Sequence, residues 1–457
     1  LADAPPPADR DRDNPPIPRD ATRPGAHRPR ANDPIGDTAM TAPPLDSALA
    51  KLAAATVPRA RKVALAYSGG LDSALCAVLA RERYDAEEVV PITVDLGQGE
   101  AALAAGQARA ERLGLAPLVI DGRGEFSEVW LKKAIRANAD YNGYPCATAL
   151  ARQFLAALVA QQALELGCDA LMDGSSGTDN EQYRLHNVFT LFAPRLPALV
   201  PVRDFGLTRA ERLALCDHHG IPTDDAPGEG EDRTLWCHAL AAGDLGLDTT
   251  LPADAWLWWT PPAAAPDEPA TLTLTFEAGV PTRLDGRPLP LRELIPLLND
   301  LGGAHGVGKL DLWEDGIVDL KSRAVYEAPA AAILLKLHRD LEGFCLTKDE
   351  IAFKRLVEQR WAALVYDGEW FHPLRADLDA FIAQTQGVVN GEYTIALYKG
   401  NVEIVTRHSP TSLFSPETHA LAAASANQQL AGPAARVRGL PYEILARRNA
   451  ALRATWQ

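Results

Sequence analysis

Short apolar runs alternate with helical stretches from residue 62 to about residue 175. The apolar runs are KVALAY (62–67), VVPITVDLG (89–97), PLVIDG (117–122) and ALMDGS (170–175), with helical patterns between them at 73–83, at 100–113 and up to residue 168. Such a succession is typical of a parallel sheet covered on both faces. The sequence therefore predicts an α/β domain. Asp72, Asp95 and Asp173 fall at or just after its strand ends, where ligands bind.

The pattern changes after about residue 226. Strict alternation in 271–289 and again in 392–407 predicts two hairpins, the second turning on Lys399, Gly400 and Asn401. Helical patterns cover 291–301, 329–344, 347–365 and 374–386. We expect a second domain of mixed α+β structure, followed by helical pieces in 416–457.

Four segments are expected along the chain. Residues 1–60 are rich in Pro, Asp, Arg and Ala and are predicted to be disordered. Residues 61–225 form the first domain, 226–425 the second, and 426–457 a tail that either packs on another subunit or forms a simple surface helix. Met40 lies just before the folded part, so residues 1–39 are an upstream extension, a misassigned start or a functional tail. These alternatives stay open.

Composition narrows the function classes. The formal net charge of −15 disfavours a nucleic-acid substrate, because phosphate contacts require a basic face. Six cysteines without a C-x-x-C pair support neither a zinc knuckle nor a disulfide framework, and suggest small buried side chains in a reducing cytoplasm. No apolar run approaches the ~18 residues of a membrane span.

The segment Ser68-Gly-Gly-Leu-Asp-Ser73 carries the clearest chemistry. Its two glycines allow a tight turn with converging amides, and the following helix points its positive end at the same place. Ser68 and Ser73 add hydroxyl groups, and Asp72 either caps the helix or holds Mg²⁺. This loop is predicted to bind nucleotide phosphate; the simpler interpretation is an ordinary strand–helix turn.

A second glycine-rich segment is rejected as a phosphate loop. Gly303 to Lys309 has the Walker spacing through the lysine, but the next residue is Leu310. The hydroxyl that would bind magnesium is therefore missing.

The SGGLDS loop resembles that of the PP-loop ATP pyrophosphatases, and residues 61–457 resemble argininosuccinate synthases. The matching segments occur in the family's order: 66–73, 94–100, Tyr144…Thr148-Ala-Leu-Ala-Arg152, Gly174…Asn180-x-Gln182-x-Arg184, 302–311, 321–329, 397–402 and 409–417. The resemblance implies a PP-loop domain, a mixed α+β synthetase domain and a C-terminal helical tail. It also implies a cytoplasmic homotetramer that exchanges its tails.

In that family ATP adenylates the ureido oxygen of citrulline, diphosphate leaves, and the amine of aspartate attacks to give argininosuccinate and AMP, a step of arginine biosynthesis and the urea cycle. No covalent nucleophile is needed; Mg²⁺ and amide groups stabilise the departing charge.

The resemblance implies these site residues, named by motif. ATP would be bound by Ala66, Tyr67, Ser68, Gly69, Gly70, Leu71, Asp72, Ser73, Ala74, Val94 and Gly174. The catalytic residues would be Ser68, Asp72 and Ser73, with Mg²⁺ at Asp72. The amine donor would meet Ser176, Asn180 and Glu181, and the acceptor Tyr144, Asn180, Arg184, Glu314 and Tyr326. Arg152 has two equally weighted interpretations: a structural residue that stabilises the loop (a brace), and a functional residue.

The chain departs from the family pattern in its substrate segments. The pattern H-G-x-T-G-K-G-N-D-Q-x-R becomes 173–184 here, with Asp173 for histidine, Thr178 for lysine, Asp179 for glycine and Glu181 for aspartate. A loop that receives an anionic amino acid has thus lost a cation and gained a carboxylate. One like charge at contact range is worth about 4 kcal/mol at an effective dielectric of ~20.

Serines expected at the acceptor site are also replaced, by Ala149, Gly230 and Ala239. Each lost hydroxyl removes a hydrogen bond worth ~1 kcal/mol. The alternatives are therefore a ligase of this family with a different acceptor or amine donor, an inactive nucleotide-binding relative, and another PP-loop enzyme such as a tRNA thiolase, GMP synthase or NAD synthetase.

Overall fold

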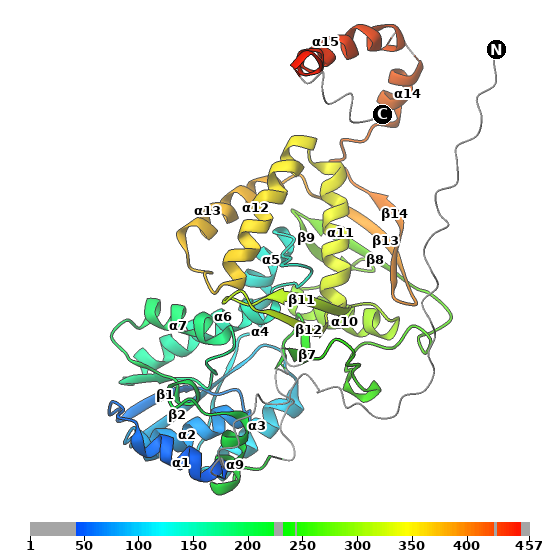
Figure 1. The fold of residues 1–457 in the computed structure, drawn as a ribbon. Helices are drawn as coiled ribbons and strands as arrows, with labels where there is room; N and C mark the ends of the chain where they lie inside the picture. The colour runs from blue at the N-terminus through cyan, green and yellow to red at the C-terminus, as the bar shows by residue number, and fades with distance from the viewer. Residues whose placement is uncertain (1–42, 224–231, 243–244, 425–426, 449–457) are drawn as a thin grey trace, which may run out of the picture. The chain divides into compact units, whose positions relative to one another are not determined.

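A five-stranded parallel sheet forms the first half of the structure, in the strand order β3-β2-β1-β4-β5. Figure 1 shows its strands β1 and β2 between helices. The computed structural model describes residues 43–223, 232–242, 245–424 and 427–448. The chain divides into units of residues 1–43 and 44–457, and all the elements belong to the second unit. The strands are β1 (Lys62–Ala66), β2 (Glu88–Asp95), β3 (Leu118–Asp121), β4 (Ala170–Met172) and β5 (Ala198–Leu199).

Helices cover both faces of this sheet. Val63 and Leu65 of β1 pack in one cluster with residues of α2 and α9, whereas Ala64 packs in another with residues of α6 and α7. Successive strand residues point to opposite faces, so both sides are buried. The α/β prediction is confirmed. The helices are α2 (Leu71–Arg83), α3 (Glu100–Arg112), α4 (Arg123–Glu125), α5 (Lys132–Arg136), α6 (Ala147–Glu165), α7 (Glu181–Phe192), α8 (Pro201–Asp204) and α9 (Arg209–His218), with a π-helical turn at Phe126–Leu131.

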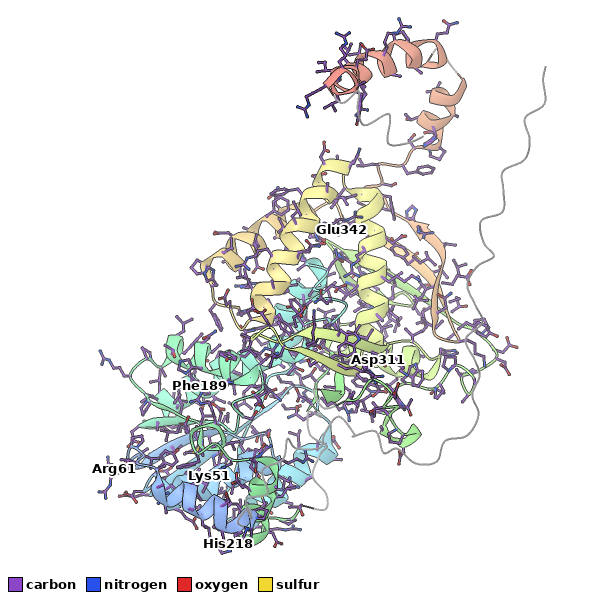
Figure 2. All side chains as sticks on the ribbon, in the orientation of Figure 1. Lys51, Arg61, Phe189, His218, Asp311 and Glu342 are labelled. Atoms are coloured by element: carbon purple, nitrogen blue, oxygen red, sulfur yellow. The ribbon has the colours of Figure 1, made fainter. Side chains whose placement is uncertain are left out.

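Part of the segment that was predicted to be disordered is a helix, α1 (Pro44–Ala54). Ala48 and Leu52 are buried against the α2–α9 side of the sheet. Lys51, labelled in Figure 2, extends from α1 to Glu211 of α9, with 2.7 Å between Nζ and Oε2. The prediction was wrong here because composition missed a short amphipathic face that is stabilised only by its tertiary partner. Residues 1–42 lie outside the described residues.

Glu211 joins α1 to α9. Its side chain accepts hydrogen bonds from Ser47 and Lys51, and it forms a capping box with Thr208 at the start of α9. Burial alone would raise the pKa of Glu211, but the hydrogen bonds from Lys51, Ser47 and Thr208 outweigh it and lower the pKa to about 2. The ionised form therefore stabilises the fold.

We expect Glu211→Gln to destabilise the protein by roughly 2 kcal/mol at neutral pH, discounted for the partly exposed Lys51. A lowered pKa contributes stability above the unfolded value near 4.5, and this stability is lost as the pH falls toward 2. Urea unfolding between pH 7 and pH 3 should show the gap between wild type and variant narrowing. The exposed Glu165→Gln is the control; a constant gap for Glu211→Gln would contradict the assignment.

The second half contains two antiparallel sheets and long helices (Figure 1). The two predicted hairpins, 271–289 and 392–407, both lie in the first of these sheets, and the second sheet was not predicted. The first sheet has the order β10-β9-β8-β13-β14 and the second the order β11-β12-β7-β6. Their strands are β6 (Asp232–Arg233), β7 (His238–Ala242), β8 (Ala270–Glu277), β9 (Val280–Leu284), β10 (Arg287–Pro288), β11 (Lys309–Asp315), β12 (Lys321–Glu327), β13 (Gly391–Tyr398) and β14 (Asn401–His408). A 3₁₀ turn spans Ala253–Ala255.

The helices here are α10 (Leu291–Ala304), α11 (Pro329–Cys345), α12 (Lys348–Tyr366) and α13 (Pro373–Gln386). Residues of α10, α11 and α12 share one hydrophobic cluster with residues of β8 and β13. The β13–β14 hairpin turns at Lys399 and Gly400, both with positive φ, as a tight two-residue turn requires.

Two helices end the described chain, α14 (Pro416–Ala424) and α15 (Asn427–Arg448). Several apolar side chains of α15 are exposed: Leu430, Val437, Leu440, Tyr442 and Ile444. Across the described residues, none of the helices combines the length and the apolar character that a membrane crossing requires.

Candidate functional site

A cavity of about 1250 Å³ opens at the carboxyl ends of the parallel strands. Its lining comes from 66–73, from the ends of β2 and β4, and from the four-stranded sheet that contains β7 and β12. This volume exceeds the ~300–1,000 Å³ typical of a site for one small ligand. The cavity can therefore hold more than one substrate together.

The phosphate-type loop lies at one end of this cavity. Gly69 has φ +83°, and a Cβ there would lie 2.7 Å from the Cα of Gly106 in α3, so backbone packs on backbone. The Ser73 hydroxyl donates to the Gly70 carbonyl (2.9 Å), and Ser68 Oγ accepts from the Gly70 amide (3.2 Å). No side chain caps α2, which starts at Leu71. The first-turn amides of α2 therefore face the cavity without a side-chain cap, a geometry suited to anions.

Asp72 and Gly174 meet beside this loop. A Cβ on Gly174 would lie 3.2 Å from both the carbonyl carbon and the Cβ of Asp72, so only glycine fits there without displacement. Arg212 of α9 donates to Asp72 Oδ2. The Asp72 carboxylate thus has a cationic protein partner.

Of the eleven residues expected to bind ATP, ten line the cavity, together with all the expected substrate residues. Ala74 is fully buried in α2 and does not line it. Among the strand-end aspartates, Asp72 and Asp173 line the cavity and Asp95 does not. The Walker-like segment is also elsewhere: a Cβ on Gly308 would overlap Pro329, and Lys309 lies over the rings of Trp256 and Trp259.

The substrate loop is organised by Asp179. Oδ2 accepts from the amide and hydroxyl of Ser176 (2.9 and 2.8 Å), and Oδ1 accepts from the amides of Glu181 (3.1 Å) and Gln182 (3.3 Å). Burial, and then the neighbouring Glu181, raise the pKa of Asp179. This carboxylate, taken from the sequence as added negative charge for the ligand, is largely engaged in capping α7.

Arg152 joins the substrate loop to the second half of the chain. Its Nε lies 2.7 Å from Glu181 Oε1, and its Nη2 lies 3.4 Å from Asp232 Oδ2. Burial raises the pKa of Asp232, and Arg152 opposes that rise. The structure thus supports the brace interpretation, although Arg152 also lines the cavity.

Arg152→Met should leave two partly buried carboxylates without a counter-charge, and we expect a loss of ~3 kcal/mol in unfolding free energy. Without the cation, the pKa of Asp232 in the folded state rises further because Arg152 no longer opposes its burial, so the deficit should shrink as the pH falls from 7 to 5. Thermal unfolding at both pH values tests this. Arg292→Met, at an exposed position, should change little; an equally small effect of Arg152→Met would refute the brace.

The acceptor residues converge on Glu314, which is 6% exposed. The hydroxyls of Tyr326 and Tyr366 both donate to its carboxylate, the latter at 2.8 Å. The rings of Tyr144 and Tyr326 stack with 4.8 Å between centroids. Burial, and then the neighbouring Tyr144 and Glu314, raise the pKa of Tyr326, so this phenol stays protonated.

Tyr366 is a residue that the sequence analysis missed. The amide of Asn180 donates to its hydroxyl (3.2 Å), Arg184 Nε donates to its carbonyl (3.0 Å), and the Arg184 guanidinium lies over its ring. It ends the 19-residue helix α12, and no motif marks it. Only the tertiary contacts at the end of α12 show that Tyr366 joins Asn180, Arg184 and Glu314.

The replaced serines have different surroundings. Ala239 lines the cavity, and its backbone pairs with Asp232 and Tyr326. Ala149 is fully buried in α6 and does not line the cavity. Gly230 lies outside the described residues.

Comparisons with known proteins cover nearly all of this architecture. The profile described as arginosuccinate synthase N-terminal HUP domain matches residues 62–222, and that of the C-terminal domain matches residues 230–444. The chain is 40% identical over 393 residues to the argininosuccinate synthase of Methanopyrus kandleri, covering 85% of this chain and 99% of that one.

Two further relatives are similar. The argininosuccinate synthase of Rubrobacter xylanophilus is 42% identical over 363 residues (78% of this chain, 88% of that one). That of Thermosynechococcus vestitus is 39% identical over 399 residues (85% and 98%). Among solved structures, the U34-tRNA thiolase NcsA from Methanococcus maripaludis superposes with a TM-score of only 0.28, at 18% identity over 40% of this chain and 66% of that one, too weak a likeness to carry an argument.

Proposed function

This chain belongs to the argininosuccinate synthase family, and we propose on that premise that it ligates citrulline to aspartate with ATP, releasing argininosuccinate, AMP and diphosphate. It is an ATP-dependent ligase of the AMP-forming, carbon–nitrogen type. The observation that carries the proposal is a single cavity whose lining includes the SGGLDS loop, the substrate loop, Glu314 and Tyr326.

The reaction follows from this placement. The ureido oxygen of citrulline attacks the α-phosphorus of ATP, and the bond to diphosphate breaks. The amine of aspartate then attacks the activated carbon, loses a proton, and AMP leaves with the former ureido oxygen. A ureido carbon is a poor electrophile until its oxygen becomes part of a leaving group, so the acceptor must lie beside the α-phosphate before an amine can react.

Different groups of the protein would carry out the separate steps of this reaction. The amides of Gly69, Gly70 and the first turn of α2 would receive the charge that develops on diphosphate. Tyr326 and Arg184 would hold the acceptor, with Tyr366 as a positioning residue behind them. Glu181, already oriented by Arg152, would meet the incoming amine.

Magnesium fits the loop as a companion of ATP. Carboxylate and hydroxyl oxygens are the ligands that Mg²⁺ prefers, and Asp72, Ser68 and Ser73 supply them at the cavity wall. Within the described part of the chain, no group of three or more His, Cys, Asp or Glu side chains forms a metal cage. The phosphates of ATP would supply the remaining ligands, and the ion would neutralise charge on diphosphate.

The oligomeric state and the cellular location of the protein are also proposals. We infer a cytoplasmic homotetramer in which α15 packs on another subunit, since its exposed Leu430, Val437 and Ile444 form an apolar surface. We also propose the domain limits 61–225 for the PP-loop domain, 226–425 for the synthetase domain and 426–457 for the C-terminal tail. Light scattering of the full chain and of a chain ending at residue 425 tests the role of the tail.

An isotope experiment tests the reaction. With citrulline labelled by ¹⁸O at the ureido oxygen, the label should appear in AMP and not in diphosphate. Formation of ADP, or unlabelled AMP, would refute the mechanism. The same assay with related ureido compounds and amines tests the substituted positions: efficient turnover of citrulline and aspartate would exclude the altered-substrate alternative.

A further inference from the structure

Asp173 is a buried carboxylate that forms no ion pair with the described residues, and it lies at the nucleotide end of the cavity. It follows β4, is 3% exposed, and lines the cavity. Oδ1 accepts from the Ser175 amide (2.8 Å), and no salt bridge to Asp173 is present in the described ranges. A buried carboxylate needs a cation or a proton. Among the described residues no cation forms an ion pair with Asp173, and the charge of Arg203 acts on it only from a distance.

Asp173 lies directly beside the phosphate-type loop. Its carbonyl accepts from the Cys76 thiol in the second turn of α2 (3.6 Å), and the next residue, Gly174, packs on Asp72. The carboxylates of Asp72 and Asp173 both contribute to the raised pKa of the Cys76 thiol, after its burial. Both carboxylates therefore lie at the first turns of α2, where a nucleotide's phosphates would lie.

A second polar group lies at this position. Ser175 is 5% exposed and lines the cavity, and its hydroxyl lies beside the Asp173 carboxylate with no other partner among the described residues. A buried hydroxyl beside a carboxylate that has no ion pair presents two hard oxygen ligands to the cavity. Asp72, in contrast, already has Arg212 as its partner.

We propose that Asp173 is a ligand of the magnesium ion that enters with ATP, and that the Ser175 hydroxyl lies in the same coordination sphere, directly or through water. The inference rests on the proposed function, because ATP brings the ion. It applies to this chain in particular, since the family pattern has histidine at this position and a histidine prefers softer metals. Without the ion, the Asp173 carboxylate would repel the phosphates.

The ordinary alternative is that Asp173 only shapes the turn after β4. Asp95 provides a matched comparison: it ends the neighbouring strand β2, and its Oδ1 accepts from the amide two residues ahead, Gly97, at the same 2.8 Å. Asp95, however, does not line the cavity and has Arg123 as a partner at 3.3 Å. An asparagine would preserve the turn at either position and remove only the charge.

The experiment measures Mn²⁺ binding by electron paramagnetic resonance, with the full chain and α,β-methylene-ATP, which the enzyme cannot cleave. Asp173→Asn and Asp173→His should each weaken Mn²⁺ binding to the nucleotide complex at least 10-fold. Asp95→Asn should leave it within 2-fold of wild type. Without metal, Asp173→Asn should bind the nucleotide as tightly as wild type, or more tightly, because a repelling charge is gone.

The outcomes separate the two proposals. If Asp173→Asn binds Mn²⁺ as wild type does, the ligand assignment is refuted and the ligase function stands. If Asp173→Asn and Asp95→Asn weaken binding equally, the turn geometry explains the effect and the assignment is again refuted. If wild type binds no nucleotide with or without Mn²⁺, the proposed function fails and this inference with it. Circular dichroism before each titration confirms that the variants are folded.

Discussion

Gly69→Ala should reduce AMP formation by more than 100-fold and weaken ATP binding. At φ +83°, an alanine is strained by ~1–2 kcal/mol, and its Cβ would lie 2.7 Å from the Gly106 Cα. Neither backbone can give way easily: Arg109 of α3 donates to the Gly69 carbonyl, and the Tyr67 hydroxyl donates to the Gly106 carbonyl (3.0 Å). The loop and α3 must separate, which turns the loop amides away from the phosphates. Isothermal titration with ATP and a diphosphate-release assay measure both effects.

Gly114→Ala is the matched control for backbone strain. Gly114 also has positive φ (+67°), but a Cβ there would meet no atom within 4 Å. It should cost ~1 kcal/mol in unfolding free energy and leave ATP turnover unchanged. If Gly69→Ala behaves like Gly114→Ala, close packing of the loop on α3 is not what holds the phosphate site.

Glu314→Ala should raise the KM for citrulline by about 100-fold or more while the Kd for ATP stays the same. The substitution removes the acceptor for both the Tyr326 and Tyr366 hydroxyls in a buried site. Each unsatisfied hydroxyl costs ~1–3 kcal/mol, and Tyr366 would lose the contact that holds it under Arg184 and Asn180. Initial rates at varied citrulline, together with ATP titration, measure this split.

Two further variants test whether the effect of Glu314→Ala is specific: a conservative substitution at Glu314 and a control at another buried glutamate. Glu314→Gln keeps one oxygen as an acceptor and should recover part of the citrulline affinity. Glu342 (Figure 2) is a second buried glutamate, which accepts from Asn138 and Gln386 and pairs with Lys354 away from the cavity. Glu342→Gln should lower the melting temperature and leave the KM for citrulline unchanged. An effect on ATP binding as large as that on citrulline would contradict the acceptor role of Glu314.

Local chemistry made part of the site predictable. The SGGLDS loop could be identified because its glycines, its hydroxyls and the following helix are contiguous, so chain geometry alone brings their groups together. Glu314 and Tyr326 lie on adjacent strands of one hairpin, where β11 and β12 pair in register. The register places Glu314 opposite Ser322 and Tyr326 opposite Leu310, so alternation puts both side chains on one face, but their contact is made only in the packed structure.

Other features depended on partners far away in the sequence. Arg152 contacts Asp232, 80 residues later, and Tyr366 contacts Asn180, 186 residues earlier. In the sequence, Asp179 looks like an added charge that is unfavourable for an anionic substrate. In the structure, its carboxylate accepts hydrogen bonds from amides at the start of α7. The apolar face of α1 is too short to be recognised in the sequence. Its Ala48 and Leu52 are buried in the hydrophobic cluster, and Ser47 of the same helix donates to Glu211 of α9.

The sequence by itself determined the parallel α/β domain, the phosphate-type loop and the family of this protein, because periodicity and contiguous motifs act over a few residues. The tertiary structure decided which charges are balanced: Arg212 pairs with Asp72 and Arg152 with Glu181, whereas Asp173 is buried and forms no ion pair with the described residues. Ion pairing and desolvation depend on distances between elements that are remote along the chain. Those distances exist only after the sheets and helices have packed.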